Sequence, residues 1–158
     1  CGDKLNIYKA LAKYNIDLMP ENSNIFISFG EIDCRHDQGF ILASEKTEKT
    51  TKHIIEKTVE GYISWFKNNE KKHIFYFFNI PAPIYNFDIN KSLNNKVADV
   101  VYTFNKHLEK ILKKYSFKMI DVYTSTKNKE KFSNNSFHCD FCHLDNRIIK
   151  IIEEQLSS

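Results

Sequence analysis

Apolar and polar residues follow two different periods along this chain, and the two periods alternate. Short apolar runs rich in β-branched and aromatic residues predict three strands, at about 24–29, 73–79 and 117–123. Elsewhere apolar residues recur every three or four positions, as on a helix packed against a sheet. This spacing predicts helices over 3–15, over a polar-rich segment that opens at 44–45 and includes 55–66, over about 94–115 and over about 144–156.

Strands that alternate with long helices indicate an α/β fold. The crossover from each strand to the next is expected to be right-handed and to place helices on both faces of a parallel sheet. We therefore predict a three-layer α/β/α sandwich of the flavodoxin-like type, forming one domain over residues 1–158. Ligands bind beyond the carboxyl ends of the strands in such sheets. The loops of interest are 30–37, 79–86 and 124–143.

Composition narrows the function classes. The 23 basic and 20 acidic residues give a formal charge of +3 and are mixed along the chain, which does not indicate a nucleic-acid interface. The most apolar run, 74–84, is shorter than the ~20 residues of a membrane span. The four irregularly spaced cysteines do not form a secreted disulfide framework, so a cytoplasmic protein is expected.

The third loop holds the densest set of reactive residues, in the stretch SFHCDFCHLDNR at 136–147. Asp140 and His143 are three residues apart, so the carboxylate can accept a hydrogen bond from the imidazole and leave its other nitrogen free as a general base. The alternative is structural, with Asp140 capping the final helix and His143 an ordinary surface residue. The position of the pair at the carboxyl end of the sheet favours the catalytic interpretation.

A second charged cluster follows the first strand, in FGEIDCRHD at 29–37. The chain leaves the strand through Gly30 and presents Glu31, Asp33, Arg35 and His36 within six residues. The structural alternative is a charged turn in which Arg35 pairs with Glu31 or Asp33. Charged groups beside the end of a strand are costly unless they are paired, and perturbed groups gather at functional sites.

Together the two clusters resemble the SGNH (GDSL-like) hydrolase superfamily. The DFCHL segment at 140–144 matches the D-x-x-H-L block of that family before its last helix, and GEID at 30–33 partly matches its G-x-N-D block. The resemblance implies that His143 is the general base and Asp140 its orienting acid. It implies that Gly30, Glu31, Asp33 and Arg35 surround the substrate and the oxyanion.

The sequence departs from the family in two places. The G-D-S block with the nucleophilic serine is not visible, so the resemblance places it upstream together with the first strands of the fold. Ile32 stands where the family has an asparagine that donates to the oxyanion, and losing one such donor typically costs about 100- to 1000-fold in rate. Arg35 or another group would have to replace it.

The resemblance implies a hydrolase or acyltransferase that acts on an ester of a carbohydrate or another small polar molecule, without a metal or organic cofactor. We expect His143 to face the 30–37 loop, with His138 and Cys139 pointing elsewhere and with Cys34 and Cys142 as small buried fillers. One alternative is a binding domain that kept the fold without the chemistry. The other is a zinc site in which the sulfurs of Cys139 and Cys142 converge with a histidine nitrogen and a fourth ligand.

Overall fold

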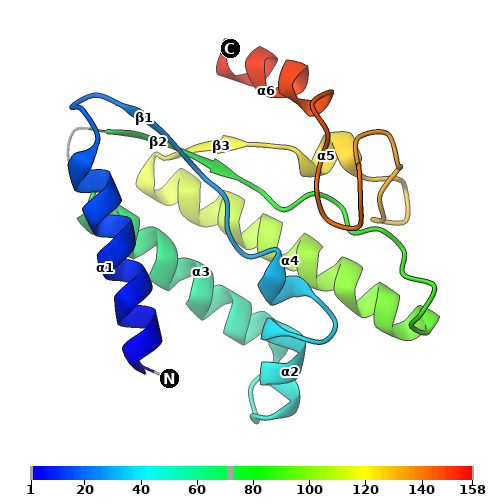
Figure 1. Cartoon of the computed structure of the whole chain (residues 1–158). Helices are drawn as coiled ribbons and strands as arrows, with labels where there is room; N and C mark the ends of the chain where they lie inside the picture. Colours follow the sequence, from blue (N-terminus) through cyan, green and yellow to red (C-terminus); the bar gives the residue numbers. More distant parts are fainter. Residues whose placement is uncertain (1, 71–72, 158) are drawn as a thin grey trace.

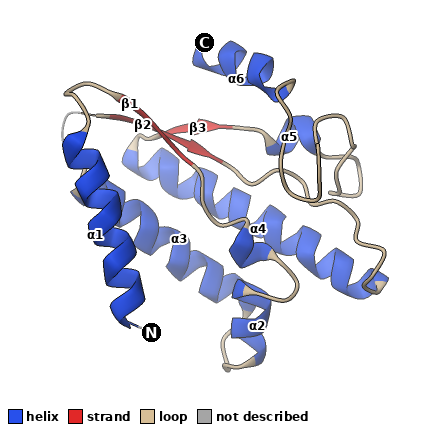
Figure 2. Ribbon diagram, viewed as in Figure 1, coloured by secondary structure: helices blue, strands red, loops and turns tan. Residues whose placement is uncertain are grey.

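A parallel three-stranded sheet forms the centre of the molecule, as the sequence predicts. A computed structural model describes residues 2–70 and 73–157. Its strands β1 (Asn24–Ile27), β2 (Ile74–Phe78) and β3 (Lys118–Ile120) lie in the order β1-β2-β3, and both pairs are parallel (Figure 2). The α/β fold class is therefore confirmed.

Helices cover the two faces of this sheet unequally. α3 (Thr51–Asn68) and α4 (Lys91–Tyr115) lie against one face, and α6 (Ile148–Leu156) lies on the other (Figure 1). The side chains of β2 contribute to the cores on both faces of the sheet, because successive side chains of a strand point to opposite faces. Phe75 and Phe77 join the larger core under α3 and α4, whereas Tyr76 and Phe78 join the smaller one under α6.

Local hydrogen bonds begin and end the two long helices. The side chain of Thr50 accepts a hydrogen bond from the amide of His53 at the start of α3, and Asn90 accepts one from Leu93 at the start of α4. These caps satisfy amides that have no partner within the helix. α4 is followed by Ser116, which has a left-handed backbone with a φ of 59°, and the amide of Phe117 donates back to the Leu112 carbonyl.

Several element boundaries differ from the sequence prediction. The polar-rich helical segment is two helices, α2 (Gly39–Glu45) and α3, and the first helix, α1 (Gly2–Leu18), is longer than expected. The short helices η1 (Ile32–Cys34) and α5 (Tyr123–Thr126) are too brief to leave a periodic pattern. α6 begins at Ile148 and not at 144, because 144–147 form a β-bridge and a turn.

One edge and part of one face of the sheet are less covered than the rest. Within residues 2–70 and 73–157, no strand pairs with the outer edge of β1. Phe26 of that strand stacks on Tyr76 with 5.1 Å between ring centroids, yet about half of Phe26 is exposed. None of the described helices has the length and apolar content needed to cross a membrane.

Candidate functional site

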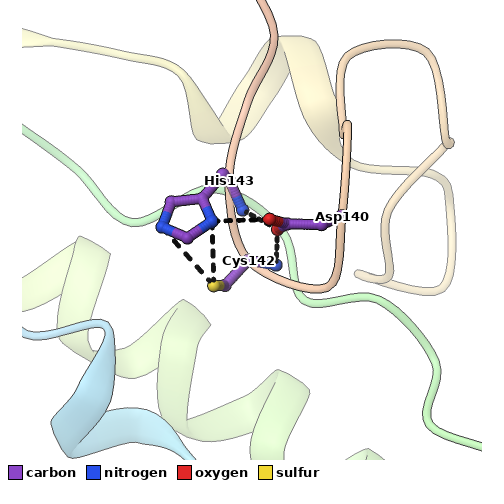
Figure 3. A group of neighbouring side chains, drawn as sticks. All are labelled: Asp140, Cys142 and His143. Atoms are coloured by element: carbon purple, nitrogen blue, oxygen red, sulfur yellow. Dashed lines mark hydrogen bonds and ion pairs between the residues drawn. The ribbon is translucent and has the colours of Figure 1, made fainter.

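Asp140 and His143 form the hydrogen-bonded pair that their spacing predicts. The distance between Asp140 Oδ2 and His143 Nδ1 is 2.7 Å (Figure 3). The other carboxylate oxygen, Oδ1, accepts the amide hydrogens of Cys142 at 2.9 Å and of His143 at 2.7 Å. These bonds hold the pKa of Asp140 well below its usual range, the Cys142 amide having the largest effect. The other ring nitrogen, Nε2, does not bond to Asp140 and has the sulfur of Cys142 at 4.0 Å (Figure 3).

A small antiparallel turn presents this pair. His138 and Leu144 form an isolated β-bridge, the amide of Cys139 donates to the carbonyl of His143, and the amide of Asp145 donates to that of Phe137. Asp140 closes the tip of the turn through the two amides it accepts. Asp140 therefore does not cap α6, as the structural alternative supposed, because α6 begins after Arg147 without a side-chain cap.

The loop after β1 lies beside this turn. Arg35 donates to both carboxylate oxygens of Glu31, from Nε at 3.0 Å and from Nη2 at 2.7 Å. One of the pairings in the charged-turn alternative is thus present. Partial burial raises the pKa of Cys142, Glu31 and Asp140 raise it further, and Arg35 opposes them. Glu31, Arg35 and Cys142 line the same cavity, so the loops after β1 and β3 meet here.

A cavity of about 190 Å³ opens where the three strand-end loops meet. The loop after β1 contributes Glu31 and Arg35, and the turn after β3 contributes His138, Phe141 and Cys142. The loop after β2 and the facing side of α4 supply a mainly apolar wall: Ile80, Pro81, Ala82, Pro83, Ile84, Val97 and Val101. These are the loops that a parallel sheet uses for ligands. His143 lies next to the residues that line the cavity.

Buried polar side chains fix the apolar wall. Asn105 bonds to both backbone groups of Ile80, and Thr126 Oγ1 accepts the amide hydrogen of Ala82 at 3.0 Å. The amide of Ser133 donates to the carbonyl of Pro83 at 2.8 Å. Since these bonds satisfy the backbone amides of the buried residues Ile80, Ala82 and Ser133, the wall is a preformed surface.

His138 lies in the cavity wall, contrary to the expectation that it would point elsewhere. Its Nδ1 is 2.8 Å from the hydroxyl of Ser133, which is buried. Burial lowers the pKa of His138. Cys139 is exposed, with its sulfur 3.5 Å from the carbonyl oxygen of His143. The sequence gives no signal for which of His138 and Cys139 faces the cavity, because their side-chain directions depend on the conformation of the turn.

The four residues that were predicted to surround the substrate do not all lie at one site in the structure. Glu31 and Arg35 line the cavity, whereas Asp33 lines a different groove between α1 and α3, with Tyr62. Burial and the nearby Glu31 raise the pKa of Asp33. Gly30 has a φ of +95° and packs on the ring of Phe104, so it shapes the turn from beneath. The catalytic and oxyanion roles of these residues stay predictions.

The cysteines differ from the fillers and from the zinc ligands that the sequence suggested. Cys34 is buried as expected, but Cys142 is partly exposed and lies in the cavity wall. The donor atoms of Asp140, Cys142 and His143 lie within 4.8 Å of one another. In the described part of the chain, this cluster does not include Cys139, so the two sulfurs do not converge as the zinc alternative requires.

Comparisons with known proteins indicate a fold. No protein-family model matches this chain, and no curated protein matches its sequence. A solved structure, the crystal structure of the C-terminal domain of the Drosophila Oskar protein, is similar with a TM-score of 0.52 and 16% sequence identity. The match covers 89% of this chain and 64% of the Oskar chain. At this identity the likeness supports the α/β fold alone.

Proposed function

We propose that this chain carries the acid and base of an SGNH-like ester hydrolase or acyltransferase site. The observation that carries the proposal is the 2.7 Å bond from Asp140 Oδ2 to His143 Nδ1 at the carboxyl end of a parallel sheet. Asp140 orients the ring and stabilises its protonated form, while Nε2 takes the proton of the nucleophile. The substrate is an ester of a carbohydrate or another small polar molecule.

The reaction divides into two transfers. A serine hydroxyl attacks the ester carbonyl carbon, and its proton passes to His143 Nε2. The tetrahedral intermediate then expels the alcohol, which takes that proton from the imidazolium, and an acyl-serine remains. In the second transfer, water in a hydrolase or an acceptor hydroxyl in a transferase gives its proton to His143 Nε2 and attacks the acyl-serine carbonyl carbon. The bond between the acyl group and the serine oxygen then breaks, the serine takes the proton from the imidazolium, and the free acid or the new ester leaves. The reaction needs no metal or organic cofactor.

The serine must come from outside the described residues in this proposal. Among residues 2–70 and 73–157, no serine hydroxyl is hydrogen-bonded to the His143 ring. The sulfur of Cys142 lies 4.0 Å from Nε2, but its raised pKa disfavours the thiolate that a cysteine nucleophile requires. The family resemblance therefore remains the reason to expect a serine, carried by a segment that precedes Cys1.

Hydrolysis of p-nitrophenyl acetate tests the proposal in a protein that includes the serine-bearing segment. The variant His143→Ala should lose about 100-fold or more in kcat/KM, as removal of a general base typically does. His53→Ala is the matched control, because His53 is exposed on α3 and away from the cavity. Equal turnover by the wild type and His143→Ala would remove His143 from the mechanism.

A non-catalytic binding domain is the second candidate. Ile32, at the position of the oxyanion-donating asparagine in the resemblance, is more than half exposed and offers no side-chain donor. If a protein with the serine-bearing segment binds an ester in the cavity but does not hydrolyse it, the binding function stands and the hydrolase proposal fails.

A further inference from the structure

His138 is a second imidazole at the site, and the proposed acid–base pair does not use it. It lines the cavity together with Arg35, Cys142 and the apolar wall from the β2 loop and α4. Only Nδ1 has a hydrogen-bond partner among the described residues, namely Ser133 Oγ at 2.8 Å. Nε2 is therefore free to meet a ligand.

The hydrogen bonds around Ser133 decide which nitrogen of His138 carries the proton. Ser133 Oγ already accepts the amide hydrogen of Asn135 at 2.9 Å. If Nδ1 were the protonated nitrogen, it would also donate to this oxygen, and the proton of the buried hydroxyl would have no described acceptor. If Ser133 instead donates to Nδ1, the hydroxyl proton of Ser133 and the Nδ1 lone pair of His138 are both satisfied. The network thus places the proton of His138 on Nε2.

Burial, and not the surrounding charge, favours the neutral form of the His138 imidazole. Burial lowers the pKa of His138, while Asp140 and Asp145 act weakly in the opposite direction. Asp145 is paired with Arg147, and Asp140 with His143. Across the cavity, Arg35 is paired with Glu31. His36 and Asp37 also line the cavity, with 4.0 Å between His36 Nδ1 and Asp37 Oδ1. Among the side chains named here, no unpaired cation selects for an anionic ligand.

We propose that His138 is a specificity-determining residue that donates its Nε2–H to a carbonyl or hydroxyl oxygen of an uncharged ligand whose short apolar group lies against the Ile80–Ile84 wall. The apolar wall and the cavity of about 190 Å³ fit a short acyl chain. Identifying the short apolar group of the ligand as the acyl part of an ester rests on the proposed function. The inference that Ser133 orients the Nε2–H donor of His138 does not rest on it.

Nuclear magnetic resonance of the imidazole nitrogens tests the tautomer directly. In the wild-type chain at neutral pH, long-range ¹H–¹⁵N spectra should show His138 as the Nε2–H form. In Ser133→Ala the hydroxyl donor is lost, so the Nδ1–H form should become populated. A wild-type His138 that is mainly Nδ1–H, or mainly doubly protonated, would overturn the proposal.

Titration with butyramide tests the donor. This probe has a neutral carbonyl and a short alkyl chain, and it should shift the His138 resonances and bind. His138→Leu should weaken that binding about three- to tenfold, the value of one neutral hydrogen bond. His138→Gln places an amide N–H near the position of Nε2, so this variant should retain most of the affinity for butyramide. Equal affinity in the leucine variant, or no perturbation of His138 by butyramide, would contradict the proposal.

These readouts are separate from turnover. If butyramide binds through His138 but His143→Ala leaves hydrolysis unchanged, the proposed function fails and the binding inference survives. If His143→Ala abolishes hydrolysis while His138→Leu leaves butyramide binding unaltered, only the inference fails. A fold check by circular dichroism on each variant separates both results from unfolding.

Discussion

Asn105 holds Ile80 by both of its backbone groups. The side-chain Oδ1 accepts the Ile80 amide hydrogen at 2.8 Å, and Nδ2 donates to the Ile80 carbonyl at 2.7 Å. Both side-chain atoms come from α4, and the residue that they bind lies two positions beyond the end of β2. The helix thereby positions the apolar wall of the cavity.

Replacing Asn105 by alanine should destabilise the protein by about 2–4 kcal/mol, because two buried backbone groups lose their partners at once. Urea unfolding measures this change. Asn95→Ala is the matched control on the same helix, since Asn95 is exposed, and it should change stability by less than about 0.5 kcal/mol. Similar midpoints for the two variants would show that the Asn105 bonds contribute little.

Gly30→Ala should also destabilise the fold, by about 2–4 kcal/mol, through two effects in one substitution. A φ of +95° strains any residue with a Cβ, and that Cβ would clash with Cζ and Cε2 of the buried Phe104 ring. Gly61→Ala provides the opposite control. Gly61 lies within α3 with open space around it, so alanine should stabilise the helix by about 0.5–1 kcal/mol. In thermal unfolding, the melting temperature should therefore fall in Gly30→Ala and rise in Gly61→Ala.

Glu31→Gln should lower the pKa of Cys142, because it removes a charge that raises this pKa and frees Arg35, which lowers it. Arg35→Met should raise it. At pH 7.5, iodoacetamide should consequently alkylate Cys142 faster in Glu31→Gln and slower in Arg35→Met than in the wild type. Mass spectrometry follows the rates, with Cys139 as the internal reference. Of the cysteines in the described part of the chain, buried Cys34, whose pKa is raised well above the usual value, should react most slowly.

The pKa of Asp140 should lie below that of an ordinary aspartate, and the pKa of Asp33 should lie above it. Since the folded pKa of Asp140 is depressed, its contribution to stability is present above the unfolded value of about 3.9 and is lost as the pH falls through the folded pKa. The pKa of Asp33 is raised, so its ionised form costs stability at neutral pH and protonation relieves that cost. Carboxyl ¹³C titration checks both directions, and a shared midpoint would contradict them.

The sequence predicts the sheet and the acid–base pair because both depend on short-range patterns. The apolar runs locate β1, β2 and β3, and their alternation with helices is enough to make the sheet parallel. The three-residue spacing of Asp140 and His143 is enough for a hydrogen bond within one turn. The loops that border the cavity follow from the position of the strand ends.

Side-chain directions within the loops could not be read from the same patterns. Glu31 and Asp33 are two residues apart in a charged segment, yet the short helix η1 sends one toward the cavity and the other toward the groove beside α1. His138 faces inward only because Ser133 and the bridge to Leu144 fix the turn. Such contacts join residues that no periodicity relates.

The acid–base pair and the apolar wall of the candidate site differ in how far apart along the sequence their bonded residues lie. The carboxylate and imidazole of Asp140 and His143 close a loop of three residues, whereas the bonds that build the apolar wall join positions 25 and 44 residues apart. Closing a short loop costs less chain entropy than closing a long one. The proton-transfer pair can therefore form early in folding and persist through local opening, while the binding cavity exists only once α4 and α5 have docked. Recognition, more than acid–base geometry, is the part of this site that depends on the complete tertiary structure.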